Sequence, residues 1–490
     1  IQRDRTEYTK PGSDTHCCEN ANSNNIVHLN AGRTVHDYTN YNLAESSLIS
    51  GSAETSIDSN KSHSFGASRL NFEDKIKIWL LKYRHLLTQT CMNDLIGICR
   101  EFGFHQFPKD VRTVIRTPKS DIFDISGGKY GHLGVESSIK KIFENISSPE
   151  NLFIDRIIPL SCNIDGLPLC KSSSSQFWPI LLSVDSKDSA LNKPFMAGLY
   201  HGLNKPNSLM FLDMFIDELE DLQLRGLSIN NEQFFPKISK IICDAPAKSF
   251  ILGVKGHTGY HGCTKCMQEG EVIKSRMTFP ETSNNPRTDE NFKNKVDENY
   301  HKVNIHSPFE RLNIGLVSQV PLDYMHLVCL GVFKRLLIFW IKGAKDVRMK
   351  QIDLEAASAD LVNNFRQCVP KEFSRLPRDL HDVDRFKATE FRQILLYSGP
   401  MIFKNRISRS QYVHFMSLHC AIRILCSPDL LKNYSEYANE LLQYFVENYG
   451  ILYGNEYITH NVHNLVHLVH DCKNHGTLDD FGAFKFENYL

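Results

Sequence analysis

Two aspartates in this sequence stand where a metal-binding carboxylate could be held at the end of a strand. Asp165 follows the apolar run 157–164 and precedes Gly166, and Asp244 follows the run 238–243 and precedes a Pro-containing turn. Such runs are typical of buried strands, and carboxylates at the ends of paired strands could bind Mg2+, which prefers oxygen ligands. For a single aspartate, a turn that simply follows a strand is the commoner explanation.

A second candidate site begins with two cysteines. Cys263 and Cys266 form a C-x-x-C pair inside the glycine-containing segment 257–266. In such a turn two thiolates can reach one zinc ion, and a structural zinc site needs four ligands in all. Two buried thiols or a redox pair would explain the same spacing, so the motif favours zinc only with two further ligands.

Histidines near the end of the sequence supply candidates for those ligands. His463 and His467 are four residues apart, so on a helix both imidazoles project from one face. His460 and His470 fall near the same face, and the spacing leaves the ligand pair open. An amphipathic helix with hydrogen-bonded histidines would also explain the run. A Cys pair and a His pair in one chain together favour a single zinc site.

The elements that would position these residues are of two kinds. The pattern between residues 157 and 244 predicts three strands, a helix and a fourth strand, at 157–164, 177–184, 194–200, 208–222 and 238–244. Helical spacing precedes this region, beginning near Phe72. Helical runs also dominate residues 322–470, at 328–341, 352–365, 412–425 and 437–447.

Composition bounds the class of protein. The chain has 490 residues, 41% of them hydrophobic, which predicts two to four structural units. Lys+Arg and Asp+Glu number 56 each, so a nucleic-acid-binding surface would have to be a local basic patch. The 14 cysteines are scattered, many in apolar runs, which is typical of a reducing compartment. The sequence shows no secretory signal, and its most apolar run is interrupted by Lys334, which argues against a membrane span.

Six separated segments resemble the transposase-domain proteins of the CACTA (En/Spm) type, in collinear order over roughly residues 75–490. They are Asn163 to Leu169, Gln176 to Ile180, Cys243 to Ala247, Lys255 to Tyr260, Pro321 to His326 and Phe486 to Leu490. The resemblance implies a DDE transposase of the α/β class. Its RNase H-like mixed-sheet core would be interrupted by a large all-α insertion and preceded by a small helical N-terminal module.

The resemblance also implies roles for particular residues. It implies three catalytic acids that hold two Mg2+ (or Mn2+) ions, namely Asp165, Asp244 and Glu487. It implies four ligands of one structural Zn2+, namely Cys263, Cys266, His463 and His467. Asp323 and His326 match a D-x-x-H pattern in which Asp323 would orient His326, and an Asp323 that only caps its own helix is an equal alternative.

The implied chemistry acts on DNA. A metal-bound water would cleave a phosphodiester at a transposon end, and the freed 3′ hydroxyl would attack target DNA at the same metals. The implied partners are DNA and further copies of the chain, without a membrane or a small-molecule substrate, and the DNA substrate implies a nuclear location. Basic residues of the insertion are candidates for phosphate contacts, although a solvated helix face explains any one of them: Lys334, Arg335, Arg385, Lys387 and Arg392.

The expected domain organisation follows the same order. It comprises a disordered lead-in (1–68), a helical module (69–150), the core with the first two acids and the C-x-x-C (151–270), a polar connecting segment (271–320), the helical insertion (321–455) and a final segment with the H-x-x-x-H and the start of the third-acid helix (456–490). The first residue is Ile1, and Glu487 stands three residues from the end. Both features indicate a fragment, and a truncated catalytic helix would make it inactive.

Two other classes of function fit the same residues. A domesticated or decayed derivative that keeps the fold and the zinc site would bind DNA or protein without catalysis. A zinc-stabilised hydrolase of another phosphodiester would share the two-metal site. The intact acids favour the transposase, while the zero net charge favours the derivative. Metal-dependent cleavage of cognate DNA ends would separate them.

Overall fold

The structure is a computed structural model that describes residues 71–83, 86–115, 121–144, 146, 152–188, 191–283 and 285–490. The chain divides into two units, with the boundary between Ile115 and Arg116. The expected disordered lead-in, residues 1–68, lies outside the described residues. No helix of the described residues is both long enough and apolar enough to cross a membrane.

The first unit consists of three helices, α1 (Phe72–Tyr83), α2 (Gln89–Glu101) and α3 (Val111–Ile115). Thr88 begins α2, because its hydroxyl accepts a hydrogen bond from the Cys91 amide at 3.2 Å. The apolar side chains of Leu80, Ile96 and Phe107 are fully buried and form its small core. This unit contains the helical region that the sequence predicts before the strands.

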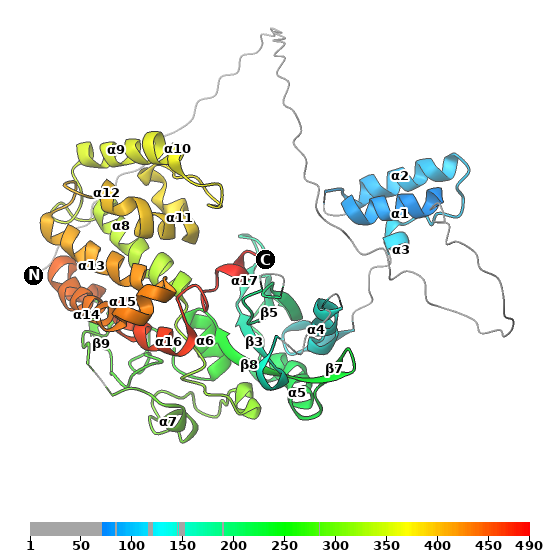
Figure 1. Cartoon of the computed structure of the whole chain (residues 1–490), viewed down its shortest axis with the longest axis horizontal. Coiled ribbons are helices and arrows are strands. Elements are labelled where there is room, and N and C mark those ends of the chain that lie inside the picture. Colours follow the sequence, from blue (N-terminus) through cyan, green and yellow to red (C-terminus); the bar gives the residue numbers. More distant parts are fainter. Residues whose placement is uncertain are drawn as a thin grey trace, which may run out of the picture. The chain divides into compact units, whose positions relative to one another are not determined.

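The second unit is built on a curled mixed sheet (Figure 1). Its strands follow the order β1-β2-β6-β5-β3-β8-β7, and β4 (Leu167–Pro168) pairs with β5 off this path. Their bounds are β1 (Ile122–Ile125), β2 (Gly128–His132), β3 (Ile157–Ile164), β5 (Gln176–Val184), β6 (Phe195–Gly202), β7 (Leu227–Ile229) and β8 (Glu232–Ile242). All neighbours are antiparallel except β3 and β8, which run parallel. The mixed α/β class expected from the sequence is therefore confirmed.

One expected boundary is wrong. The helical module was expected to reach residue 150, but the first unit ends at Ile115. The next residues form β1 and β2, which join the main sheet beside β6, and α4 (Val135–Phe143). The strands β1 and β2 are short and partly exposed, so they lack the continuous apolar run that identifies a buried strand.

A long helix, α5 (Ser208–Arg225), connects β6 to the strands that follow it. Asn207 caps its start, because its side-chain oxygen accepts from the amides of Leu209 at 3.0 Å and Met210 at 3.2 Å. Phe211 and Phe215 are fully buried in the same core as the sheet residues. The sequence predicts this order of three strands, a helix and a further strand, which are β3, β5, β6, α5 and β8.

Helices make up the region between the sheet and the end of the chain (Figure 1). They are η4 (Met325–Phe333), α8 (Lys334–Lys342), α9 (Gln351–Ala359), η5 (Asp360–Phe365), α10 (Arg366–Cys368), η6 (Leu380–Arg385), α11 (Ala388–Gln393), η7 (Ile394–Ser398), α12 (Gly399–Ile402), α13 (Arg409–Leu425) and α14 (Pro428–Tyr453). Trp340, Phe415 and Phe445 are fully buried in their common core. The expected helical character of this region matches.

The connecting segment 271–320 is more ordered than expected. It contains the hairpin β9 (Glu271–Ile273) and β10 (Arg276–Thr278), the short helix α7 (Asp289–Lys293) and the turn η3 (Pro308–Leu312). Its polar composition hides these elements, because each is too short to show a period. The Phe279 amide donates to the Ile458 carbonyl at 2.8 Å, so the hairpin is tied to the C-terminal region.

The chain ends in short helical pieces. They are η8 (Asn455–Tyr457), α15 (His460–His463), η9 (Asn464–His467), α16 (Leu468–His475) and α17 (Phe484–Glu487). A tighter 3-10 turn therefore lies between His463 and His467, where the sequence predicts one continuous helix. The α6 helix (Ala245–Leu252) follows β8, and Asp244 stands between the two elements.

Candidate metal centres

The two sequence-predicted aspartates leave the sheet at the same edge. β3 and β8 are parallel neighbours with Asn163 opposite Ile242, and the Asn163 side-chain amide donates to the Ile242 carbonyl at 2.8 Å. Continued by two residues, this register sets Asp165 opposite Asp244. The carboxyl ends of adjacent parallel strands meet at one edge, which is where ligand sites of open α/β sheets lie.

Asp165 is held in an environment that disfavours its charge. Burial raises the pKa of its carboxyl to about 7, and the carboxylates of Asp244 and Glu487 act in the same direction. The positive charge of His326 opposes this rise, as does the Gly166 amide, which donates to Asp165 Oδ1 at 2.7 Å. A cation bound beside Asp165 would favour the ionised form.

Glu487 and His326 reach Asp165 from distant parts of the chain. Each of these three residues offers a ligand atom, and the three atoms lie within 4.8 Å of one another. Asp244 is not in this group, and its Oδ1 accepts from the Ala247 amide at 2.7 Å and caps the start of α6. The acid centre thus comprises the carboxylates of Asp165 and Glu487 and the imidazole of His326, with Asp244 as a third carboxylate at its edge.

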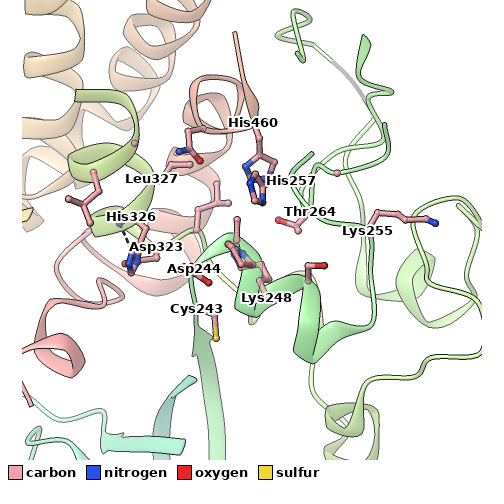
Figure 2. Close-up of a pocket in the computed structure, with 18 residues that line it drawn as sticks. Cys243, Asp244, Lys248, Lys255, His257, Thr264, Asp323, His326, Leu327 and His460 are labelled. Carbon is pink, nitrogen blue, oxygen red and sulfur yellow. Dashed lines mark hydrogen bonds and ion pairs between the residues drawn. The ribbon is translucent and has the colours of Figure 1, made fainter. Parts of the chain in front are cut away.

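His326 is fixed by Asp323, as Figure 2 shows. The buried Asp323 Oδ2 accepts from His326 Nδ1 at 2.5 Å. Burial lowers the pKa of His326, but its hydrogen bond to Asp323 dominates together with the nearby carboxylates and raises the pKa to about 9. The imidazole therefore carries a positive charge at neutral pH and partly offsets the acidic group.

Asp323 does more than orient His326. Its Oδ1 accepts from the Ala483 amide at 2.8 Å and from the Met325 amide at 3.2 Å, and its Oδ2 also accepts from the His326 amide at 3.0 Å. Both alternatives raised by the sequence are therefore present, the helix cap and the orientation of His326. The bond to Ala483 also fixes the residue that precedes α17, which carries Glu487.

Lys485 anchors α17 from its other side. Its Nζ donates to Asn192 Oδ1 at 2.8 Å and lies 4.0 Å from Asp185 Oδ1. Burial lowers the pKa of Lys485 to about 8. Phe486 is fully buried in the helical core beside it. The short α17 is thus held by its surroundings rather than by its own four residues.

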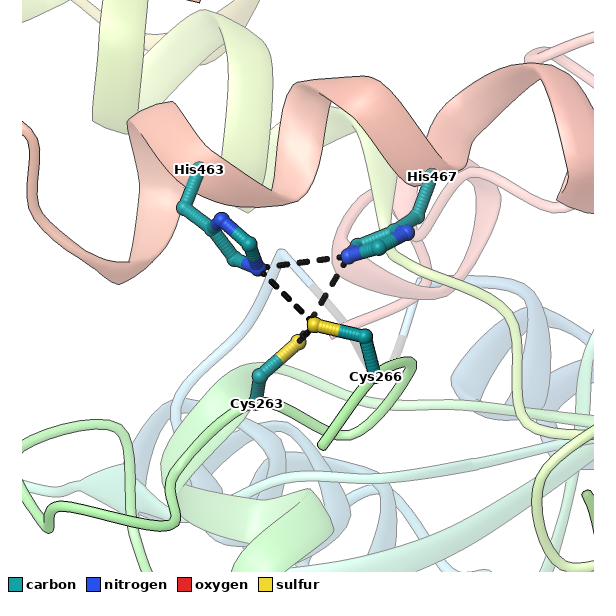
Figure 3. Close-up of side chains that lie close together, drawn as sticks. All are labelled: Cys263, Cys266, His463 and His467. Atoms are coloured by element: carbon teal, nitrogen blue, oxygen red, sulfur yellow. Dashed lines mark hydrogen bonds between the residues drawn. The ribbon is translucent and has the colours of Figure 1, made fainter. Parts of the chain in front are cut away.

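The cysteines and histidines form a second group, drawn in Figure 3. The two sulfur atoms are 3.5 Å apart, and the two Nε2 atoms are 3.2 Å apart. Cys266 Sγ lies 3.3 Å from His463 Nε2, and Cys263 Sγ lies 3.7 Å from His467 Nε2. All four ligand atoms thus converge on one point, where they can hold a metal ion.

The neighbouring histidines are used differently. His463 Nδ1 is 3.1 Å from the Glu281 carbonyl, which fixes the proton on Nδ1 and leaves Nε2 for a metal. His470 is exposed and is bonded to Asn474 at 3.1 Å. His460 is buried, and its Nδ1 has no hydrogen-bond partner within the described part of the chain. The structure therefore selects His463 and His467 from the four candidates that the spacing left open.

A buried ion pair connects the two centres. Lys265, between the two cysteines, donates to Asp471 Oδ1 at 2.6 Å, and both side chains are at most 5% exposed. Asp471 Oδ2 accepts from the Leu322 amide at 2.8 Å. Leu322 precedes Asp323, so the Cys/His centre, α16 and the acid centre share one network. The sequence shows no period or motif that would have identified this pair.

A pocket of about 220 Å³ lies beside the acid centre (Figure 2). Asp244 and His326 line one side, and His257 and His460 line the other. Lys248 of α6 also lines it and donates to the Pro321 carbonyl at 2.8 Å. Burial lowers the pKa of Lys248 to about 8. Space next to the acid centre is thus open to a ligand.

The five basic candidates of the insertion fall into three sets. Lys334 and Arg335 line a second pocket. Arg385 and Lys387 are exposed, and Arg385 lies 3.9 Å from Asp382. Arg392 donates to Asp479 at 2.8 Å. Lys334 and Arg335 thus border a cavity, whereas Arg392 is engaged within the fold.

Comparison with known proteins adds no relative. The sequence matches no protein-family model, and it has no significant match among curated proteins.

Proposed function

We propose that this protein is a DDE-type transposase of the CACTA (En/Spm) type, an RNase H-like enzyme that cleaves and joins DNA strands. The observation that carries the proposal is the position of Asp165. It follows β3, its parallel neighbour β8 leads to Asp244, and Glu487 comes within 4.8 Å from the end of the described chain. Acids that converge from such separate elements are typical of a catalytic metal site.

The topology supports an RNase H-like core. In the order β6-β5-β3-β8, the strands β6, β5 and β3 are antiparallel neighbours. The strand β8 lies beside β3 and runs parallel to it. The helix α5 makes the crossover between β6 and β8. A mainly helical region, which also contains the β9–β10 hairpin, then separates the second acid from the third.

The acid centre fits divalent cations by its charge and its donors. Asp165 and Glu487 offer carboxylate oxygens, and burial of Asp165 near two further carboxylates leaves negative charge that a cation would offset. Divalent ions bound there stabilise the attacking and leaving oxygens of phosphoryl transfer. Asp165, Asp244 and Glu487 would hold the ions, while His326 and Asp323 position this group.

The Cys/His centre fits zinc by its dimensions. A tetrahedral zinc ion with bonds of about 2.3 Å to sulfur and about 2.05 Å to nitrogen sets sulfurs roughly 3.8 Å apart, nitrogens roughly 3.3 Å apart and mixed pairs roughly 3.6 Å apart. The corresponding distances in the structure are 3.5 Å, 3.2 Å, and 3.3 and 3.7 Å. Cys263, Cys266, His463 and His467 would thus hold one structural Zn2+.

Nicking of supercoiled plasmid in Mn2+ or Mg2+ tests the proposal. The variants Asp165→Asn and Glu487→Gln should each lower the rate by at least about 100-fold, because each removes a metal-binding oxygen. Glu372→Gln, which changes an exposed acid outside both centres, is the control and should nick normally. Nicking by Asp165→Asn at the unaltered rate would exclude this centre as the source of the activity.

A non-catalytic derivative is the second candidate, favoured by the state of Asp244. One of its oxygens caps α6, and its carboxylate is not among the three converging donors. Titration of the protein with Mn2+ separates the candidates. The transposase binds Mn2+ and loses that binding in Asp165→Asn, whereas the derivative binds DNA without Mn2+ uptake at the acid centre.

A further inference from the structure

The second pocket is basic and aromatic and has no assigned role. Its volume is about 560 Å³, within the range of pockets that bind small molecules or parts of larger ones. It is lined by Arg276 of β10, by Lys334 and Arg335 of α8, and by aromatic rings. None of the residues that line it is acidic. An anionic ligand with apolar parts would fit such a lining.

The three cations of this pocket have no close acidic partner among the described residues, although Arg276 and Lys334 act at longer range on Glu456 and Asp384. Within the part of the chain that the structure describes, Arg276, Lys334 and Arg335 form no ion pair within 4.0 Å. By contrast, neighbouring cations outside the pocket do, as when Lys274 pairs with Glu456 at 2.9 Å and Lys342 pairs with Asp384. Cations that gather at one cavity without a close ion pair favour the binding of phosphate groups.

Three aromatic rings in mutual contact, those of Tyr453, Phe339 and Tyr457, line one part of the pocket. Phe339 stacks on Tyr453 at 5.2 Å with 12° between the planes, and Tyr457 meets Phe339 edge-on at 4.8 Å. Arg276 Cζ lies 4.3 Å from the centre of the Tyr457 ring. The guanidinium thus covers one face of the partly exposed Tyr457 ring, and a nucleobase would stack on this face when the guanidinium moves to a phosphate.

The pocket adjoins the one beside the acid centre. Leu330, Gly331 and Asn461 line both pockets. A Cβ atom on Gly331 would lie 2.4 Å from Asn461 Nδ2, so this close approach of α15 to η4 requires glycine. A ligand that occupies the second pocket can therefore continue toward Asp244 and His326, which line the first.

We propose that this second pocket binds an unstacked nucleotide of the single strand that enters the acid centre. The base stacks at Tyr457, and the flanking phosphates contact Arg276, Lys334 and Arg335. The inference rests on the proposed function and deepens it by naming a single strand as the ligand. Duplex DNA presents no free base face to the Tyr457 ring. It also gives the β9–β10 hairpin a role in binding.

Binding of fluorescent oligothymidylate by anisotropy, over a series of salt concentrations, tests the proposal. The triple variant Arg276→Gln/Lys334→Gln/Arg335→Gln should weaken binding and reduce the slope of log affinity against log salt by about 2, since each lost phosphate contact removes roughly 0.7. The control is Lys404→Gln/Arg409→Gln/Lys432→Gln, three exposed cations that line neither pocket and should leave the slope unchanged.

Substitution of Tyr457 separates stacking from charge. Tyr457→Leu should weaken oligothymidylate binding at least about fivefold with an unchanged salt slope, and Tyr457→Phe should restore the affinity because it keeps the ring. The proposal is overturned if Tyr457→Leu binds normally, or if polyglutamate competes as well as oligothymidylate. Plasmid nicking tests the acid centre independently. If the protein does not nick plasmid but its oligothymidylate binding depends on the pocket residues, the proposed enzyme activity is overturned and the proposed pocket ligand is not.

Discussion

The carboxylate of Asp323 accepts a hydrogen bond from the backbone amide of Ala483 at 2.8 Å, although 160 residues separate the two in the sequence. The same carboxylate accepts from His326 Nδ1 at 2.5 Å. One buried side chain thus orients an imidazole at the acid centre and fixes the start of α17. The geometry around Asp165 therefore depends on a residue that is not one of the three acids.

Asp323→Asn should impair that geometry. An amide retains only one acceptor oxygen, so either the imidazole or the Ala483 amide loses its partner, at a cost of about 1–3 kcal/mol in unfolding free energy. Plasmid nicking should fall by roughly 100-fold, because small displacements of catalytic groups are that costly. Asp379→Asn is a matched control, since the exposed Asp379 accepts from the His381 amide at 2.9 Å and from its ring at 2.7 Å. Unchanged nicking by Asp323→Asn would contradict a positioning role.

Removal of the Cys/His ligands should release one metal ion per chain. Cys263→Ser should lose the zinc that elemental analysis detects in the unaltered protein, and its melting temperature should fall, because binding energy of a structural zinc is folding energy. Cys170→Ser changes an exposed cysteine and serves as the control. An equal zinc content in both variants would show that the metal, if bound, lies elsewhere.

Lys265→Met should destabilise the protein strongly. The substitution leaves Asp471 as a buried charge without its partner, which costs about 3–5 kcal/mol. Lys473→Met removes an exposed pair with Glu436, and it should change the unfolding free energy by about 0–1 kcal/mol. Urea unfolding of the two variants gives both values. Similar small losses in both would mean that the ion pair of Lys265 is not buried in solution.

His414 should make stability depend on acid pH. It is fully buried against Phe445, and burial lowers its pKa to about 4, from about 6.5 in the unfolded chain. Between pH 4 and pH 6.5, His414 is therefore protonated in the unfolded chain and neutral in the folded chain. The contribution is fully present above pH 6.5 and is lost as pH falls toward 4, by up to about 3 kcal/mol.

The measurement is the urea midpoint between pH 7 and pH 4. His414→Leu, which cannot titrate, should flatten the decline in this window relative to the unaltered protein. His381→Leu changes an exposed histidine and should keep the original slope. A decline in His414→Leu as steep as in the unaltered protein would assign the acid sensitivity to other groups.

The succession of strands and helices along the chain could be predicted, because buried strands form apolar runs and helices repeat apolar residues every three to four positions. The runs that end before Asp165 and Asp244 mark β3 and β8, and the helical spacing of residues 412–425 marks α13. The Cys/His group could be proposed from ligand types, and the family resemblance implied His463 and His467, but the spacing alone did not select this pair. His460 and His470 differ from them only in which way the helical turns face.

Other features carry no signal along the chain. The ion pair of Lys265 and Asp471 joins residues that are 206 positions apart. Its contribution to stability depends on burial, which composition does not reveal. The strands β1 and β2 are too short and exposed for a strand pattern, so they were assigned to a helical module. The roles of Asp165 and Glu487 in catalysis, and the identity of the metals, stay predictions.

The spacing of the Cys/His ligands also bears on how the protein is made. Cys266 and His463 are 197 residues apart. At roughly 5–20 residues per second of translation, the two thiols emerge about 10–40 s before the first of their histidine partners. During this interval Cys263 and Cys266 are exposed to oxidants and to competing metals. The proposed zinc centre can therefore close only after His463 and His467 have been translated, late in biosynthesis.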